Sequence, residues 1–74
     1  MPRIKPGAKL EEVQQRDTTE VGYVVSGRLN LQIGDETYDL REGDSFRIRG
    51  EGFRWENKGD EDAVVIWVIS PPIY

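Results

Sequence analysis

Glu20, Glu56 and Tyr23 are the side chains of this 74-residue sequence that could serve as an acid or a base in catalysis. General acid–base chemistry would require a strongly perturbed environment around at least one of them, and the sequence shows no suitable pair. The sequence has no cysteine, no histidine, no serine in a nucleophile elbow and no glycine-rich phosphate loop after a strand. This inventory predicts no catalytic residues and favours a role other than catalysis.

Glu20 is the residue whose surroundings need most explanation, because it opens the apolar stretch EVGYVV. Side chains alternate along a strand, so one face carries Glu20, Gly22 and Val24 and the other carries Val21, Tyr23 and Val25. Both faces are largely apolar, which predicts that one lines the core and the other packs on a second layer or a partner. A buried carboxylate needs a hydrogen-bond partner, a cation or water; the alternative is a Glu20 in solvent at the strand end.

Aromatic residues could line a pocket in the interior, and the candidates are Phe46, Phe53, Trp55 and Trp67. Arg54 or Tyr23 would then supply polar contacts, since ligand pockets are mostly apolar with a few polar groups. In a core this small, the alternative is that each aromatic side chain fills space. Both interpretations stay open from the sequence.

Short strands separated by turns would position these residues. Gly27 marks a tight turn, and Gly34-Asp35 suits a two-residue hairpin turn of type II′ because glycine takes the first central position. Alternation then predicts inward-facing sets: Leu29, Leu31 and Ile33; Tyr38 and Leu40; Phe46 and Ile48. Residues 63–69 are apolar on both faces and predict a central strand, which Pro71 and Pro72 end. Units of about 8 to 10 residues predict an all-β sandwich or barrel.

The length of the chain predicts a single domain, residues 1–74. Residues 1–7 are expected to form an extended N-terminal arm that ends in a turn at Pro6-Gly7, and residues 8–15 a strand or an irregular edge. A chain of this size buries a marginal core and has no disulfide to support it, so we expect a homodimer.

Charge and hydropathy argue against several classes of partner. The net charge is -4, the isoelectric point is about 4.7, and no run of basic residues is present, which disfavours direct contact with nucleic acid. The sequence has neither a run of about 20 apolar residues nor the apolar core of a signal peptide. We therefore expect a cytoplasmic protein without a membrane contact or a cofactor.

Together, these residues resemble the cupin superfamily. Glu20 and Gly27 keep the second half of the first cupin motif, a glutamate, six residues and a glycine. Gly43-Asp44-Ser45 matches the opening of the second motif, and residues 53–61 resemble its close, with Phe53 where the family has a histidine. The ending WVISPPIY is similar to that of cupin domains fused behind a helix-turn-helix in bacterial transcriptional regulators. The resemblance covers nearly the whole chain and implies a small all-β cupin-type β-barrel, a double-stranded β-helix or jelly roll.

The departure from the family concerns its usual metal site of three histidines and one glutamate. Without histidine, Glu20 alone cannot hold a divalent transition metal, so we expect no metal site. The family's histidine positions fall near Gln14 and Arg16, which suggests that an Arg16–Glu20 ion pair replaces the metal; the alternative is a solvated Arg16. The expected ligand-binding residues are Arg16, Glu20, Phe46, Phe53 and Trp55.

The resemblance implies a metal-free cupin domain that binds a small molecule, forms a homodimer, or does both, as the sensor domain of a bacterial transcriptional regulator. A ligand in the barrel would alter the dimer and so the attached DNA-binding units, and the chain would be an excised domain or a stand-alone relative. One alternative is a cupin-type enzyme, an isomerase, epimerase or lyase. Another is a structural dimeric scaffold, natural or designed, without a ligand.

Overall fold

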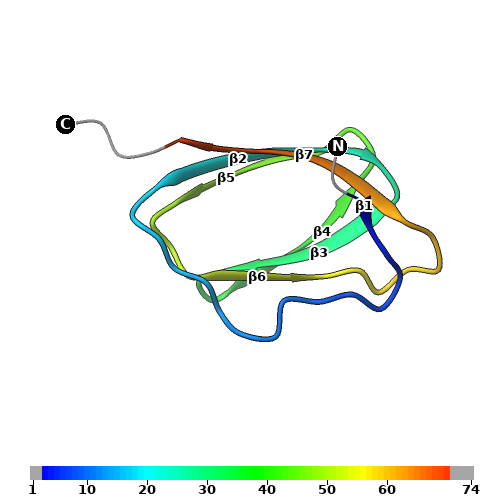
Figure 1. Ribbon diagram of the computed structural model, residues 1–74, viewed down its shortest axis with the longest axis horizontal. Helices are drawn as coiled ribbons and strands as arrows, with labels where there is room; N and C mark the ends of the chain where they lie inside the picture. The colour runs from blue at the N-terminus through cyan, green and yellow to red at the C-terminus, as the bar shows by residue number, and fades with distance from the viewer. Residues whose placement is uncertain (1–2, 71–74) are drawn as a thin grey trace.

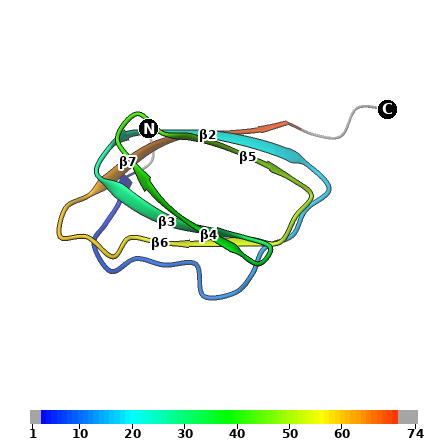
Figure 2. The same cartoon turned by 180° about the vertical axis from the view of Figure 1, so that it is seen from behind.

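The computed structural model describes residues 3–70, which fold into two antiparallel β-sheets (Figure 1). One sheet has the strand order β1-β7-β2-β5 and the other has the order β4-β3-β6. The view from behind shows the same two layers, with β2, β5 and β7 facing β3, β4 and β6 (Figure 2). No helix that is long and apolar enough to cross a membrane occurs in the described part of the chain.

The strands are β1 (Arg3–Ile4), β2 (Thr19–Ser26), β3 (Arg28–Ile33), β4 (Glu36–Arg41), β5 (Ser45–Arg49), β6 (Phe53–Glu56) and β7 (Ala63–Ser70). β7 lies between β1 and β2, which confirms that the strand apolar on both faces is central. Its predicted end at Pro71 and Pro72 lies outside the described residues, as do Met1 and Pro2 of the arm.

Glycines with positive φ make the two tight turns that frame β3. Gly27 joins β2 to β3 with φ of 79°, and Gly34 opens the turn from β3 to β4 with φ of 57°. Ile33 pairs with Glu36 across that turn, and Asp35 has no positive φ. A positive φ at the first central residue alone is the type II′ geometry that the sequence predicts.

The core lies between the sheets and follows the predicted alternation. Glu20, Gly22 and Val24 of β2 are buried, as are Leu29 and Leu31 of β3. The buried apolar residues are Ile4, Val24, Leu29, Leu31, Leu40, Phe46, Ile48, Phe53, Ala63, Val64 and Val65. Tyr38 pairs with the buried Leu31 and so lies on the inward side, as predicted, but β4 is an edge strand and leaves Tyr38 46% exposed.

The segment before β2 runs along the free edge of β6 (Figure 1). Gln14 and Phe53 exchange two backbone hydrogen bonds of 2.8 Å, and the N–H of Leu10 donates to the carbonyl of Trp55 at 2.9 Å. This confirms the irregular edge predicted for residues 8–15, and it covers an edge that would otherwise be open to pairing. The predicted turn at Pro6-Gly7 is also present, with φ of 81° at Gly7.

Candidate functional site

Glu20 lies on the inner face of β2 and is only 1% exposed. Its neighbours in register are Ile48 on β5 and Ile69 on β7, so the strands beside it offer no charged partner. The alternative of a solvated Glu20 at the strand end is therefore wrong. A carboxylate buried in such surroundings is stable only where donors compensate for the loss of water.

Two donors reach the Glu20 carboxylate, and both contact Oε1. The indole Nε1–H of Trp67 donates at 2.8 Å, and Nη2 of Arg16 lies at 3.4 Å. The predicted ion pair with Arg16 is thus present, although the Arg16 side chain remains 47% exposed. A distance of 3.4 Å is long for a charge-assisted hydrogen bond, so Trp67 is the closer and stronger partner.

Three aromatic rings fill the interior beside Glu20. Phe46 and Trp67 pair with Gly22 from either side, and their rings meet edge to face with centroids 4.8 Å apart. A Cβ atom at Gly22 would overlap the Phe46 ring, so the glycine makes this contact possible. The centroid of the Phe53 ring lies 5.9 Å from that of the Trp67 ring. The Arg16 guanidinium lies over the Phe53 ring, 5.7 Å from its centroid. The aromatic residues therefore pack as core at this point.

The structure brings together four of the five predicted site residues, namely Arg16, Glu20, Phe46 and Phe53. Trp67 contacts three of them, Glu20, Phe46 and Phe53. The sequence signal that could have placed it in the interior is its position on the same face as Ala63 and Val65. Trp55 packs against the core and borders a hollow with Lys9 and Glu11 instead.

Two further side chains do not supply the predicted polar contacts to the interior. Tyr23 is on the outer face of β2 and is 46% exposed. Arg54 is exposed and donates from Nε to Oε1 of Gln32 at 3.3 Å. The residue that does present an unused polar atom is Thr18, whose Oγ1 is buried without a hydrogen-bond partner among the described residues.

The residues around Glu20 do not fit the metal centre that the cupin resemblance implies. The one carboxylate contacts a guanidinium and an indole, its Oε1 already accepts from the indole, and the phenyl rings that pack on this indole offer no ligand atom. Within residues 3–70, no group of three or more His, Cys, Asp or Glu side chains could hold a metal ion. Divalent transition metals need several nitrogen, sulfur or oxygen ligands, so we derive no chemistry through a metal.

Replacement of Trp67 by phenylalanine tests the hydrogen bond to Glu20. We expect the variant to lose about 3 kcal/mol of unfolding free energy, from the smaller ring and from the unsatisfied buried carboxylate. In a Glu20→Met background the same change should cost at least about 1.5 kcal/mol less, because no carboxylate then needs the donor. Urea denaturation of the wild type, the two single variants and the double variant measures this difference. Equal losses in both backgrounds would contradict the hydrogen bond from Trp67 to Glu20.

Comparison with known proteins places this geometry in a family. The Cupin_2 family, described as a cupin domain, matches residues 2–69. The polyketide synthase CurC of Streptomyces cyaneus is 33% identical over 69 residues, which are 92% of this chain and 45% of that protein. The chain thus spans about half the length of this relative.

Solved structures share the fold. The Cupin_2 domain of an XRE family transcriptional regulator from Enterobacter cloacae has a TM-score of 0.83 and 23% identity, over 96% of this chain and 77% of that one. A predicted oxalate decarboxylase from Thermotoga maritima has a TM-score of 0.85 and 21% identity, over 95% of this chain and 62% of that one. These proteins differ in function, so the fold alone does not decide between roles. Since the family match extends over nearly the whole sequence, the chain belongs to the cupin domain family.

Proposed function

We propose that this cupin domain is a dimerisation module, in which the outer face of β2 and β7 binds a second copy of the chain. The observation that supports the proposal most is an apolar patch on that face. The patch consists of four large side chains that are 42–55% exposed: Val21, Tyr23, Ile66 and Val68. The proposal places the domain in the cytoplasm and assigns it no catalytic step.

The register of β2 and β7 makes the patch continuous. Tyr23 pairs with Ile66, and Val21 pairs with Val68, so the four side chains form two adjacent cross-strand pairs. Paired side chains on one face of a sheet are in contact with each other. Contiguous exposed apolar surface of this kind marks an interaction site more often than scattered apolar residues do.

A second copy fits the apolar character of the patch. None of its four side chains is charged, so two copies of the patch can meet without burying a charge, and the exposed Arg47, which pairs with Val21 from β5, would lie at the rim of the contact. A standard interface takes about 800 Å² from each partner. Such an interface would take about one-sixth of the 5166 Å² that the chain exposes.

Within a larger protein, such a module would hold two attached units together. The similarity in fold to a regulator's cupin domain agrees with this use, in which the attached units bind DNA. A change at the dimer contact would then change the free energy of DNA binding by the attached units by about 1 to 3 kcal/mol.

An Ile66→Lys variant tests the proposed dimer. In a two-fold dimer each substitution occurs twice, so we expect the dissociation constant to rise at least about 100-fold. Sedimentation equilibrium over a range of concentrations measures this constant. Tyr38→Lys is the matched control, because Tyr38 is 46% exposed on β4 of the other sheet. A monomeric wild type, or an equal effect of both variants, would contradict the proposal.

A second candidate function is the binding of a small polar molecule at the Glu20 end of the interior. Two observations favour it: the buried Oγ1 of Thr18 has no partner among the described residues, and Arg16 is half exposed with a long contact to Glu20. A native mass spectrum would show a discrete added mass that denaturation removes. Retention of that mass in an Arg16→Gln, Glu20→Gln double variant would exclude this site.

A further inference from the structure

The outer face of the β4-β3-β6 sheet differs from the apolar patch on the other sheet. It is covered by polar side chains in three cross-strand rows. The register gives these rows as Thr37, Gln32 and Arg54; Asp39, Asn30 and Glu56; and Arg41 with Arg28. Successive rows point to the same side because they are two residues apart along each strand. We call this surface the polar face.

Two hollows adjoin on the polar face. The first, of about 260 Å³, is lined by residues of the first two rows together with Lys9, Leu10, Glu11, Trp55 and Lys58. The second, of about 310 Å³, is lined by Arg28, Leu29, Asn30, Asp39, Lys58 and Gly59. Asn30 and Lys58 line both hollows, so the two hollows adjoin, and we call them together the depression.

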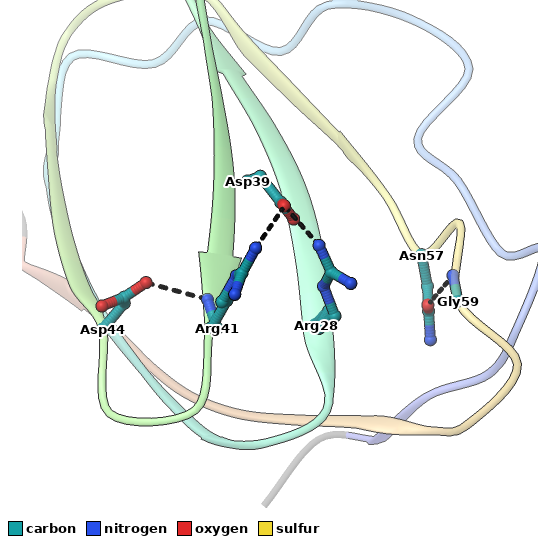
Figure 3. Close-up of polar contacts among 6 residues, drawn as sticks. All are labelled: Arg28, Asp39, Arg41, Asp44, Asn57 and Gly59. Atoms are coloured by element: carbon teal, nitrogen blue, oxygen red, sulfur yellow. Dashed lines mark hydrogen bonds and ion pairs between the residues drawn. The ribbon is translucent and has the colours of Figure 1, made fainter.

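The walls of the depression are held by backbone and side-chain bonds. Leu10 N–H donates to the Trp55 carbonyl at 2.9 Å, which fixes the segment that forms one wall. At the opposite end, Asp39 lies between Arg28 and Arg41 and contacts both guanidinium groups (Figure 3). Gly59 is held by a 2.9 Å hydrogen bond from its N–H to Asn57 Oδ1. Because these elements are fixed in the free chain, the depression is preformed, which lowers the entropic cost of binding.

The lining has an excess of positive charge. Arg28 and Lys58 face Asp39 in the second hollow, whereas Lys9, Arg54 and Lys58 face Glu11 and Glu56 in the first. Among the described residues, neither lysine makes an ion pair, and Asp39 is shared by two arginines. Each counted once, the lining residues include four basic and three acidic side chains, so the depression has an excess of one positive charge on a chain of net charge -4, which favours an anionic group.

The polar side chains of the lining that make no hydrogen bond indicate what accompanies that anionic group. Asn30, Thr37 and Glu56 border the first hollow, and their side chains make no hydrogen bond to another described residue. An amide, a hydroxyl and a carboxylate together offer donors and acceptors to ligand hydroxyl groups, which are themselves both donor and acceptor. Leu10 and Trp55 also border this hollow, although both side chains pack against the core.

The geometry points to a binding site for a polyhydroxy carboxylate, of the sugar-acid class, on the polar face. Its carboxylate would lie between Arg28 and Lys58, and its hydroxyl groups would contact Asn30, Thr37 and Glu56. The Glu56 carboxylate repels the anionic end and so favours this orientation. The site lies on the sheet opposite the proposed dimer contact, so ligand binding and dimerisation are separable.

Titration of ¹⁵N-labelled protein with D-glucuronate, followed by NMR, tests the site. We expect saturable shifts at the side-chain amides of Asn30 and Gln32 and at the indole N–H of Trp55. D-glucose, which lacks the carboxylate, should bind at least about threefold more weakly. Lys58→Gln should weaken glucuronate binding about three- to tenfold. Lys5→Gln, which changes an exposed lysine outside both hollows, should leave it unchanged.

Three results would overturn the assignment. One is the absence of saturable shifts with glucuronate at concentrations of tens of millimolar. Another is equal binding of glucose and glucuronate, or equal binding by the Lys58→Gln and Lys5→Gln variants. The third is a set of shifts confined to Glu20 and Trp67, which would place the ligand in the interior instead. None of these results depends on whether the protein is a dimer.

Discussion

Replacement of Gly27 by alanine is expected to remove about 3 to 5 kcal/mol of unfolding free energy, a large share of the stability of a domain this small. Gly27 has φ of 79°, a conformation that costs an L-residue about 1 to 2 kcal/mol. An alanine Cβ would also overlap the carbonyl oxygen of Asp62 and lie 2.9 Å from Cα of Ala63. The backbone at the start of β7 cannot move away without disturbing its pairing with β2.

Gly34→Ala is the control for this prediction. Gly34 also has a positive φ, of 57°, but a Cβ atom there meets nothing within 4 Å. The control should therefore lose only about 1 kcal/mol, from the backbone conformation alone. Thermal melts at one protein concentration should show a decrease of about 4 to 8 °C for the control and at least about 12 °C for Gly27→Ala. Similar decreases would mean that the contact with Asp62 is not important for stability.

An Asn57→Asp variant is expected to lose about 3 to 4 kcal/mol. The Asn57 side chain is fully buried, and its Nδ2 donates to the carbonyls of Ile4 at 2.8 Å and Glu61 at 2.9 Å. Aspartate would place an acceptor, or a negative charge, against both carbonyl oxygens. Oδ1 of Asn57 accepts from the N–H of Gly59, a contact that aspartate can keep (Figure 3). The loss therefore reports on the bonds that tie β1 to the turn before β7.

Asn30→Asp makes the same chemical change on the polar face. Asn30 is half buried and makes no side-chain hydrogen bond with the described residues, but its cross-strand neighbours are Asp39 and Glu56, so the added negative charge should cost up to about 1 kcal/mol. Urea denaturation of both variants gives the comparison. A loss at Asn57 no larger than the loss at Asn30 would show that the buried amide does not hold β1 in place.

Strands and turns could be predicted from the sequence because they follow local rules. Gly34 before Asp35 was sufficient to predict the type II′ hairpin turn. The apolar run 63–69 was sufficient to predict a strand with neighbouring strands on both sides. Residues 8–15 could be expected only as a strand or an irregular edge, because their backbone bonds go to β6, about 40 positions along the chain or more. Tyr38 follows the alternation of β4, but the sequence did not indicate that β4 lies at an edge.

The candidate site could be predicted in part. The Arg16–Glu20 pair was accessible because the two residues are four apart and because the cupin resemblance places both near the family's metal position. The hydrogen bond from Trp67 joins residues 47 positions apart, and it depends on the side-by-side order of β7, β2 and β5 in the sheet. Local patterning does not specify that order, so Trp67 stood as an aromatic without an assigned partner.

Trp55 illustrates the same limit. Its alternation with Phe53 suggested a shared pocket, yet only Phe53 approaches Trp67 and Arg16. The pattern of β2 could place Val21 and Tyr23 on one face, opposite Glu20, but not say that this face points outward; the assembled sheet adds Ile66 and Val68 beside them. The partner expected for this face remains a prediction, and it is the central claim of the proposed function.

An NMR experiment on a mixture of isotope-labelled and unlabelled protein tests that claim most directly. The two samples are unfolded together and refolded, so that half of any dimers contain one chain of each kind. Filtered nuclear Overhauser spectra then detect only contacts between chains. We predict contacts from the Tyr23 ring to the methyl groups of Ile66 and Val68 in the other copy. Intermolecular contacts confined to other surfaces would contradict this prediction. So would the absence of intermolecular contacts near 1 mM, a concentration at which a binding free energy of about 8 kcal/mol makes most of the protein dimeric.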